Sequence, residues 1–537
     1  MALSEFLSGI EKQTSALINP ALYFMVITLA ILIASLIIEN KRKKIISLKI
    51  DKKDLFLLIV LVVSFSILRH LLVQPQFIMY TDEGYYVRQG RLLLEKGIIP
   101  IEDPTRSLGW SMLIALPLIF YYSINAVFFL NQILLIGGGV VIYLIVKELF
   151  GNKWISLISS SCYIFQPGSM LWSATADNFI ALHFFLLLTF FFFLRFLREN
   201  KELLFYLSSA FLGFAVLIRR EAVILFFPLI LITSFHIKKN EKTKQKSEIK
   251  NKNIALFLVL IFLLIFPAFF HEFQYYNQSD TLPRESNGKF EGTTFGVHNL
   301  IFNTKTFLPQ LINLDYVPLA ITVIFLFSLG IFFKNHRKRK QQELQEFLIF
   351  ILLCLGSLVF IYFFSWFQTL GGSTEMWVKT KFFCTISLPV IIFNSLGLKK
   401  MFSLFRKGSK KIVIYFILIL IVISFLHPLL TIAKQFNNPS FVLQFSLTDK
   451  VNSFMEENNL TEYQIKTVFP ELIPLTKNTT PLKDQDLNYE DISFVLLDFS
   501  CQIQPQSCEE VKRRNLELVK AFGFKDVSYK LYMLKGE

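Results

Sequence analysis

Two adjacent carboxylates, Asp82 and Glu83, lie in one of the few polar stretches of a strongly apolar sequence, residues 74–110. A carboxylate close to a membrane-spanning segment is costly unless it is solvated, paired or functional. One member of the pair is therefore a candidate general base, which would remove a proton from a substrate hydroxyl. The alternative interpretation is helix capping, in which Thr81 or Asp82 starts a helix over residues 83–96.

Asp177 is a second acidic candidate, at the start of an apolar segment and next to Asn178. A carboxylate can accept hydrogen bonds from two neighbouring hydroxyls of a sugar, which makes Asp177 a candidate sugar contact. The alternative is that Asp177 complements the dipole of the helix that it starts. The sequence leaves both interpretations open.

A cationic candidate lies between two apolar segments, where Arg219, Arg220 and Glu221 follow one another. Guanidinium groups facing lipid are expensive, so these side chains are expected to face a cavity or an anion. The planar guanidinium fork fits phosphate with two parallel hydrogen bonds. In the alternative, one arginine pairs with Glu221 and the other reaches the lipid headgroups.

Three further residues lie at the ends of apolar segments that are predicted to face the same side: Glu375, Lys381 and His271. Lys381 is a further candidate phosphate ligand, and Glu375 and His271 are candidate substrate contacts. For His271 the alternative is an ordinary polar cap at the membrane interface.

The composition indicates that these residues belong to a membrane protein. Of the 537 residues, 53% are hydrophobic and 60 are Phe, and the mean hydropathy is +0.51. Apolar runs of about 20 residues, long enough to cross a bilayer, recur between residues 20 and 430. The net charge of +15 would indicate nucleic acid for a soluble protein. Here the Lys and Arg cluster in short loops, so the charge predicts membrane orientation and no nucleic-acid partner.

The fold class predicted is an all-α polytopic membrane protein with about 12 transmembrane helices. The predicted spans are 20–38, 55–73, 124–146, 154–168, 177–197, 203–218, 222–237, 253–271, 316–333, 346–366, 380–397 and 411–430. Segment 111–122 is too short to cross and is interpreted as a juxtamembrane or re-entrant helix. The basic loops are expected in the cytoplasm and cover residues 40–53, 237–253, 334–340 and 399–411.

Residues 431–537 are predicted to form a small extracytoplasmic α/β domain. Strands are expected at 464–470, 491–498 and 527–534, and a helix over 509–524. Cys501 and Cys508 lie in this part, and whether they form a disulfide stays open. Two units precede it: residues 1–54, with an extra span and a basic loop, and residues 55–430, a transmembrane module whose large outer loop is 74–123.

Some chemistries have no support in the sequence. It contains no phosphate-binding loop, no dinucleotide fingerprint and no zinc-type spacing of His and Cys. The expectation is therefore an enzyme without a cofactor or a metal, whose activated substrate arrives through the membrane.

These features together resemble the GT-C superfamily of polytopic glycosyltransferases, in particular the clan of dolichyl-phosphate-mannose–protein mannosyltransferases and the lipid A aminoarabinose transferase. Three patterns carry the resemblance: the acidic loop YTDEGYYVRQGRLLLEKG, the region from YLIVKELFGNKW through SATADNFIALHFF to the double arginine, and KFFCTISLPVIIFNSLGLKKMF. They span about residues 55–430. The sequence departs from the family where SLGWSMLIALP replaces a Pro-Pro pair.

The resemblance implies an inverting transfer of a sugar from a polyprenyl phosphate to an acceptor on the non-cytoplasmic face of the cell membrane. Because the leaving phosphate gains negative charge, Arg219, Arg220 and Lys381 are assigned as its ligands. Asp82 is assigned as the base and Glu83 as the residue that orients it. Two alternatives stay open: a transporter or flippase of a lipid-linked or anionic substrate, and a polymerase or ligase of surface glycans.

The charge distribution makes a prediction about topology. A cysteine introduced at Ser247, in a basic loop, should be labelled from the cytoplasmic side, and one at Ser493 from the opposite side. Labelling with a membrane-impermeant maleimide in intact and opened cells measures both. Reaction of the two positions from one side would contradict the topology.

Overall fold

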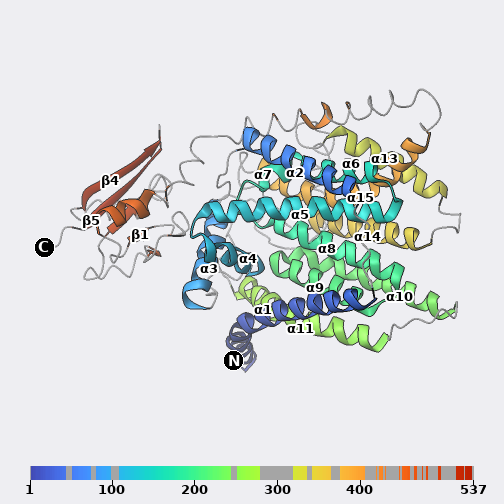
Figure 1. Cartoon of the computed structure of the whole chain (residues 1–537). Helices are drawn as coiled ribbons and strands as arrows, with labels where there is room; N and C mark the ends of the chain where they lie inside the picture. Colours follow the sequence, from blue (N-terminus) through green and yellow to red (C-terminus); the bar gives the residue numbers. More distant parts are fainter. Residues whose placement is uncertain are drawn as a thin grey trace, which may run out of the picture.

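The structure, a computed structural model, describes residues 2–43, 51–73, 80–97, 108–242, 251–278, 318–335, 342–364 and 375–404, and after them short stretches that include 450–459 and five strands. Helices dominate the part before residue 404 (Figure 1). They are α1 (Ala2–Lys43), α2 (Lys52–Leu72), α3 (Tyr80–Lys96), α4 (Leu108–Phe120), α5 (Ile124–Phe150), α6 (Lys153–Ile164), α7 (Pro167–Trp172), α8 (Phe179–Glu199), α9 (Glu202–Ile218), the 3-10 helix η1 (Arg220–Leu225), α10 (Phe226–Lys242), α11 (Asn251–Gln278), α13 (Leu319–Asn335), α14 (Gln342–Phe364) and α15 (Glu375–Leu404).

α8 lies at the centre of the bundle and packs against α5, α9 and α14. Its sequence is apolar nearly all round, which is typical of a helix with no solvent-facing side. The ring of Phe193 lies 4.3 Å from that of Phe350 in α14, and the ring of Phe196 lies 5.3 Å from that of Phe205 in α9. Large phenylalanine side chains therefore fill the space between the helices.

α5 approaches its neighbours closely because it carries three consecutive glycines. A Cβ on Gly138 would lie 2.9 Å from the Tyr163 ring, and one on Gly139 would lie 2.2 Å from Ile164 Cδ1. Small residues let membrane helices pack backbone against side chain in this way. The glycines thus fix the distance between α5 and α6.

α2 begins with a buried acidic group that is fully paired. Asp54 forms a capping box with Asp51, accepts a hydrogen bond from Tyr143 Oη at 2.5 Å, and pairs with Lys147 Nζ. Tyr143 and Lys147 both belong to α5. Since a buried carboxylate needs partners, this cluster joins the start of α2 to α5.

Six helical segments are long and apolar enough to cross a membrane: Tyr23–Lys41, Lys52–Leu72, Ile124–Phe150, Phe179–Glu199, Arg220–Asn240 and Glu343–Tyr362. Many large apolar side chains of α1 and α2 point outwards, as lipid-facing surfaces require. The protein is therefore an integral membrane protein. α4 covers only 13 residues, in agreement with a helix too short to cross.

The predicted spans up to residue 397 coincide with helical segments, with one exception. Residues 154–168 are not one helix, because α6 ends at Ile164 and α7 starts at Pro167, a residue favoured in a first helical turn. With 12 residues, α6 is about 18 Å long and shorter than the hydrocarbon core. Span 411–430 falls largely outside the described residues, so the number of about twelve spans stays a prediction.

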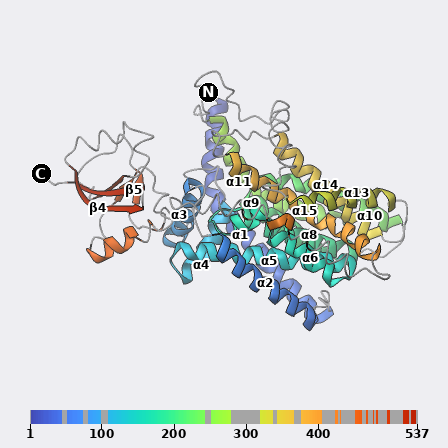
Figure 2. The ribbon, with the colours of Figure 1, turned by 90° about the horizontal axis from the view of Figure 1, so that it is seen from above.

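α3 and α4 lie together at one end of the bundle in both views (Figures 1 and 2). A Cβ on Gly90 of α3 would lie 2.7 Å from Ile114 Cγ2 of α4. A Cβ on Gly109 of α4 would lie 2.9 Å from the Leu217 carbonyl carbon and 3.0 Å from the Ile218 nitrogen in α9. α4 is thereby held between α3 and α9 with almost no space to spare.

The five strands form one sheet in the order β2-β1-β3-β5-β4: β1 (Ile465–Thr467), β2 (Thr479–Pro481), β3 (Phe494–Leu497), β4 (Leu516–Phe524) and β5 (Val527–Leu534). β1 pairs parallel with β2 and β3, and β5 pairs antiparallel with β3 and β4. Figure 2 shows β4 and β5 apart from the helices of the bundle, beyond α3, with a short helix around Phe454 beside them. Strands thus occur at all three places where the sequence predicts them, and β2 and β4 are additional.

The helix predicted over residues 509–524 is wrong for its second half, which is β4. β4 pairs with β5 across the short connection between Phe524 and Val527, and a β-bulge interrupts the register between Leu518 and Lys520. The bulge inserts a residue and breaks the strict alternation, so the apolar residues acquire a helix-like spacing. Tertiary pairing decides the conformation here.

The close contact at Gly109 predicts a large effect of one methyl group. Gly109→Ala should lower the free energy of unfolding by about 1–3 kcal/mol, since the new Cβ meets backbone that cannot rotate away. Gly356→Ala in α14 is the matched control, because a Cβ there meets nothing within 4 Å. Thermal unfolding of both variants in detergent measures the difference, and equal melting temperatures would contradict the packing.

Candidate functional site

A buried loop, residues 173–178 (SATADN), joins α7 to α8 and forms the centre of the candidate site. All six residues are buried, although their backbone is not helical. Where no water reaches, each such N–H and C=O group needs a partner from the protein. The elements around the loop supply these partners, and their polar side chains are thereby held in place.

α4 and α5 satisfy the carbonyl groups of the loop. Trp110 Nε1 donates to the Ala176 carbonyl at 2.7 Å. Asn131 Nδ2 donates to the carbonyls of Thr175 and Asp177 at 2.7 and 2.9 Å. These bonds fix the backbone on both sides of Asp177, whose side chain is 1% exposed.

Glu83 of α3 reaches the same loop. Its side chain is completely buried, and Oε2 accepts a hydrogen bond from the Ala176 N–H at 3.4 Å. Asp82 precedes it on α3, while the Asp82 side chain lies outside the described part of the structure. Of the acidic pair, Glu83 therefore lies beside the loop that carries Asp177.

The capping interpretation of Asp82 does not fit the start of this helix. α3 begins at Tyr80, so Asp82 lies within the first turn and not at the N-cap. The end agrees with the sequence, because Gly97 adopts a φ of +69° and its N–H donates to the Leu93 carbonyl at 2.9 Å. A left-handed glycine is a common helix end.

Asn178 connects the loop to α3 and to the end of α9. Its Nδ2 donates to Tyr86 Oη at 3.1 Å and to the Ile218 carbonyl at 3.3 Å, and its Oδ1 accepts from Arg219 Nη1 at 3.1 Å. A buried amide that uses both ends in this way fixes the relative position of three elements.

Arg219 belongs to this cluster, whereas Arg220 is exposed. Arg219 Nη2 also donates to Glu221 Oε1, and its Cζ lies 4.1 Å from the centre of the Phe179 ring. Part of the alternative interpretation, one arginine paired with Glu221, is therefore what the structure shows. The two arginines do not act as a matched pair.

Arg219 keeps its positive charge in this environment. Burial alone lowers the pKa of Arg219, but the nearby Glu221, Tyr362, Tyr86 and Asp177 together raise it above its ordinary value. The compensating carboxylate, Glu221, lies only two residues away, so the charge is neutralised locally.

The other predicted residues are placed only through their helices. Glu375 and Lys381 lie in the first turns of α15, and His271 lies in α11. Their side chains lie outside the described part of the structure. His183, which the sequence analysis did not single out, is completely buried in α8, and its Nε2 lies 3.0 Å from Thr385 Oγ1 of α15.

Sequence reasoning missed Trp110, Asn131 and Tyr86, which hold the loop. A signal existed for Asn131, a polar residue in the apolar run FFLNQILLI, because such residues usually serve a bonding role in a membrane. Nothing local distinguishes Trp110 or Tyr86 from other interfacial aromatic residues. Their role depends on the distant loop that they contact.

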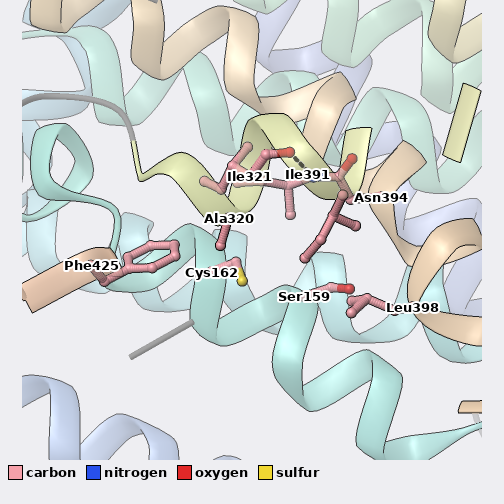
Figure 3. A pocket seen from close by; sticks show the side chains of 9 residues that line it. Ser159, Cys162, Ala320, Ile321, Ile391, Asn394, Leu398 and Phe425 are labelled. Atoms are coloured by element: carbon pink, nitrogen blue, oxygen red, sulfur yellow. Dashed lines mark hydrogen bonds between the residues drawn. The ribbon is translucent and has the colours of Figure 1, made fainter. Parts of the chain in front are cut away.

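A small pocket with an accessible volume of about 10 Å³ lies away from this cluster, between α6, α13 and α15 (Figure 3). Its walls are apolar except for Ser159 and Asn394, and Asn394 Nδ2 donates to the Ile321 carbonyl at 2.9 Å. None of the predicted site residues lines it. Among the described residues, no three His, Cys, Asp or Glu side chains are grouped to hold a metal ion.

Comparison with known proteins indicates the class to which this arrangement belongs. Residues 108–271, which include the loop and Arg219, match the family model described as dolichyl-phosphate-mannose-protein mannosyltransferase. A search with the whole sequence finds no matching curated protein.

Among solved structures, the fold is similar to that of ArnT from Cupriavidus metallidurans bound to undecaprenyl phosphate. The TM-score is 0.57 at 8% identity, over 88% of this chain and 97% of that one. ArnT from the same organism in the apo state gives a TM-score of 0.43 at 11% identity, over the same shares of both chains. The family match and the fold confirm the resemblance to the GT-C superfamily of membrane glycosyltransferases.

The loop makes a prediction about stability. Asn131→Leu preserves size but leaves the buried carbonyls of Thr175 and Asp177 without their donor. We expect a loss of about 2 kcal/mol or more in the free energy of unfolding. Asn125→Leu, at an exposed position of the same helix, is the control. If both variants melt at the same temperature, the two bonds do not hold the loop.

Proposed function

We propose that the protein transfers a single sugar from a polyprenyl phosphate to an acceptor hydroxyl, with inversion, at the non-cytoplasmic face of the cell membrane. The observation that carries this proposal is a cluster at the end of the bundle where α3 and α4 lie: Glu83, Asp177 and Asn178 are buried there, and Arg219, which is partly buried, donates to Asn178. Acidic and basic groups brought together in such a cluster are suited to transfer between a hydroxyl and a phosphate ester.

The reaction changes the charge at two places, the acceptor hydroxyl and the leaving phosphate. The acceptor hydroxyl loses a proton as it attacks the sugar, and Asp82, in the first turn of α3, is the proposed base. The bond from sugar to phosphate breaks, and the phosphate gains negative charge. Cations held in a site with little water stabilise that charge, and Arg219 and Lys381 are proposed for this role.

Asp177 is proposed to contact the sugar. Asn131 holds its backbone carbonyl, so the carboxylate is carried by a fixed loop. Glu83 is proposed to position α3 against that loop through the Ala176 N–H, and thereby to position Asp82. A base positioned by its neighbours transfers a proton more efficiently than a mobile one.

The lipid part of the donor is proposed from the comparison. The similar ArnT structure contains undecaprenyl phosphate, and the matching family model names a dolichyl-phosphate sugar. Both are polyprenyl phosphates, and a membrane-embedded site is accessible to such a donor from the bilayer. The proposed module covers residues 55–430, and residues 431–537 are proposed as an extracytoplasmic domain at the same end.

The decisive experiment compares a deletion strain complemented with wild type, Asp82→Asn or Glu95→Gln. Mass spectrometry should show a polyprenyl phosphate sugar that accumulates in the deletion strain and a glycan that loses one sugar. Wild type should reverse both changes. Unchanged lipids and glycans in the deletion strain would contradict the proposed function.

Asp82→Asn should lower the transfer rate by on the order of 10²–10⁴ without lowering the melting temperature, because Asn cannot accept the proton. Glu95→Gln is the control, since Glu95 is a partly exposed residue of the same helix whose contacts, with Arg91 at 3.7 Å and with Tyr122 Oη at 3.3 Å, lie away from the loop. Full activity of Asp82→Asn would remove Asp82 as the base.

A further inference from the structure

A buried hydrogen bond joins the central helix α8 to α15, and the proposed mechanism does not use it. His183 of α8 and Thr385 of α15 are both completely buried, and His183 Nε2 and Thr385 Oγ1 are 3.0 Å apart. The rings of Tyr163 and Phe179 lie 6.2 and 6.5 Å from the His183 ring. Because a buried polar group is costly to leave without a partner, this bond favours one rotation of α15 against α8.

A second polar contact ties α15 to α7. Ser387 Oγ donates to Gln166 Oε1 at 2.7 Å, and Gln166 immediately precedes α7. α15 is thus held on one side to α8, through Thr385, and on another side to α7, through Ser387. These are the two helices that the buried loop 173–178 joins. Two contacts on different sides of one helix fix its rotation.

α15 runs in the same direction as α8, away from the loop. Asn131, near the start of α5, binds the loop, and α5 ends at Phe150 on the far side of the bundle. Lys399 Nζ, late in α15, lies 5.0 Å from the centre of the Phe150 ring. The residues of α15 that precede Thr385 therefore lie towards the loop.

Lys381 lies one turn before Thr385 on α15. Successive residues of an α-helix are turned by about 100°, so position 381 lies about 40° from Thr385 and about 120° from Ser387. Its direction is therefore between that of α8 and that of α7, which is the direction of the loop. It also lies about 6 Å nearer to the loop than Thr385 does.

Phe179 is the residue of α8 that corresponds to this position, because it lies one turn before His183. Arg219 Cζ lies 4.1 Å from the centre of the Phe179 ring. A continuous series of contacts therefore leads from Arg219 through Phe179 and His183 to Thr385. Position 381 lies at the level of the bundle where Arg219 is held.

We infer that His183 and Thr385 are positioning residues of the transfer reaction, whose hydrogen bond turns α15 so that Lys381 faces the loop at the level of Arg219. The inference rests on the proposed function, in which Lys381 and Arg219 stabilise the leaving phosphate. His183 and Thr385 act through Lys381 and do not touch the substrate. A displacement of about 1 Å in a reacting site can cost a large part of the rate, so the rotation of α15 matters for catalysis.

A double-mutant cycle on sugar transfer by the full chain in nanodiscs tests the inference, with the polyprenyl phosphate sugar and the acceptor glycan purified from the deletion strain. Thr385→Val removes the hydroxyl and keeps the shape of the side chain. It should lower kcat about tenfold and leave the KM for the donor unchanged, because the phosphate gains its charge in the transition state. In a Lys381→Gln background the same change should have no further effect, since the group that it positions is absent.

Two variants control for other effects of these changes. Thr385→Ser keeps a hydroxyl and should transfer sugar as wild type does. Thr189→Val is the matched control in α8, because Thr189 is 1% exposed and its Oγ1 donates at 2.9 Å to the Phe185 carbonyl of its own helix. It removes a buried hydroxyl without separating two helices, so kcat should stay as in wild type.

The outcomes separate the inference from the proposed function. If wild type does not transfer sugar from this donor, the proposed function is wrong and the inference is wrong with it. If wild type is active and Thr385→Val lowers kcat equally with and without Lys381, the bond is structural and only the inference is wrong. An unchanged kcat in Thr385→Val would overturn the inference as well. Should Thr385→Val fail to fold, His183→Leu removes the other partner and is measured in the same cycle, with the same outcomes.

Discussion

The structure depends on one constraint, the need to satisfy a non-helical backbone segment inside a membrane protein. Residues 173–178 are buried, and helical hydrogen bonds serve only the two ends of this segment, Ser173 N–H and the Asn178 carbonyl. Trp110 and Asn131 supply donors for their carbonyl groups, and Glu83 accepts from the Ala176 N–H. Since these residues come from α4, α5 and α3, the requirement of a single loop brings three distant segments to one place.

The charged residues of the bundle differ in the partners that they have at its two ends. At the end of the bundle away from the loop, carboxylates pair with nearby cations, as in Arg195–Glu148 and Lys239–Glu346. These pairs are closed, because each carboxylate already has its partner. At the loop end, Arg69 of α2 pairs with the neutral Gln132 amide, and the acidic residues Glu83 and Asp177 are held beside a fixed loop.

Close packing makes this arrangement specific. Phenylalanine fills the space around α8. Gly109 lets the backbone of α4 approach that of α9, and Gly139 lets the backbone of α5 approach the Ile164 side chain of α6. In a bilayer, apolar surface alone gives helices little reason to associate, so shape and hydrogen bonds decide which helices meet. The short helices α4 and α7 can therefore take fixed positions although neither is long enough to cross the membrane.

The sequence by itself determined the membrane class, the positions of most helices and the acidic and basic candidates, because apolar length and charge are local properties. It also indicated the strands at 494–497 and 527–534 from their alternation. Only the tertiary structure decided that 516–524 is a strand, that Arg219 pairs with Glu221, and that Trp110 and Asn131 hold the loop. Trp110 and Ala176 are 66 positions apart in the sequence, and Glu83 and Ala176 are 93 positions apart. Hydrogen bonds between such distant residues have no signature in the local sequence pattern, so only the folded structure shows them.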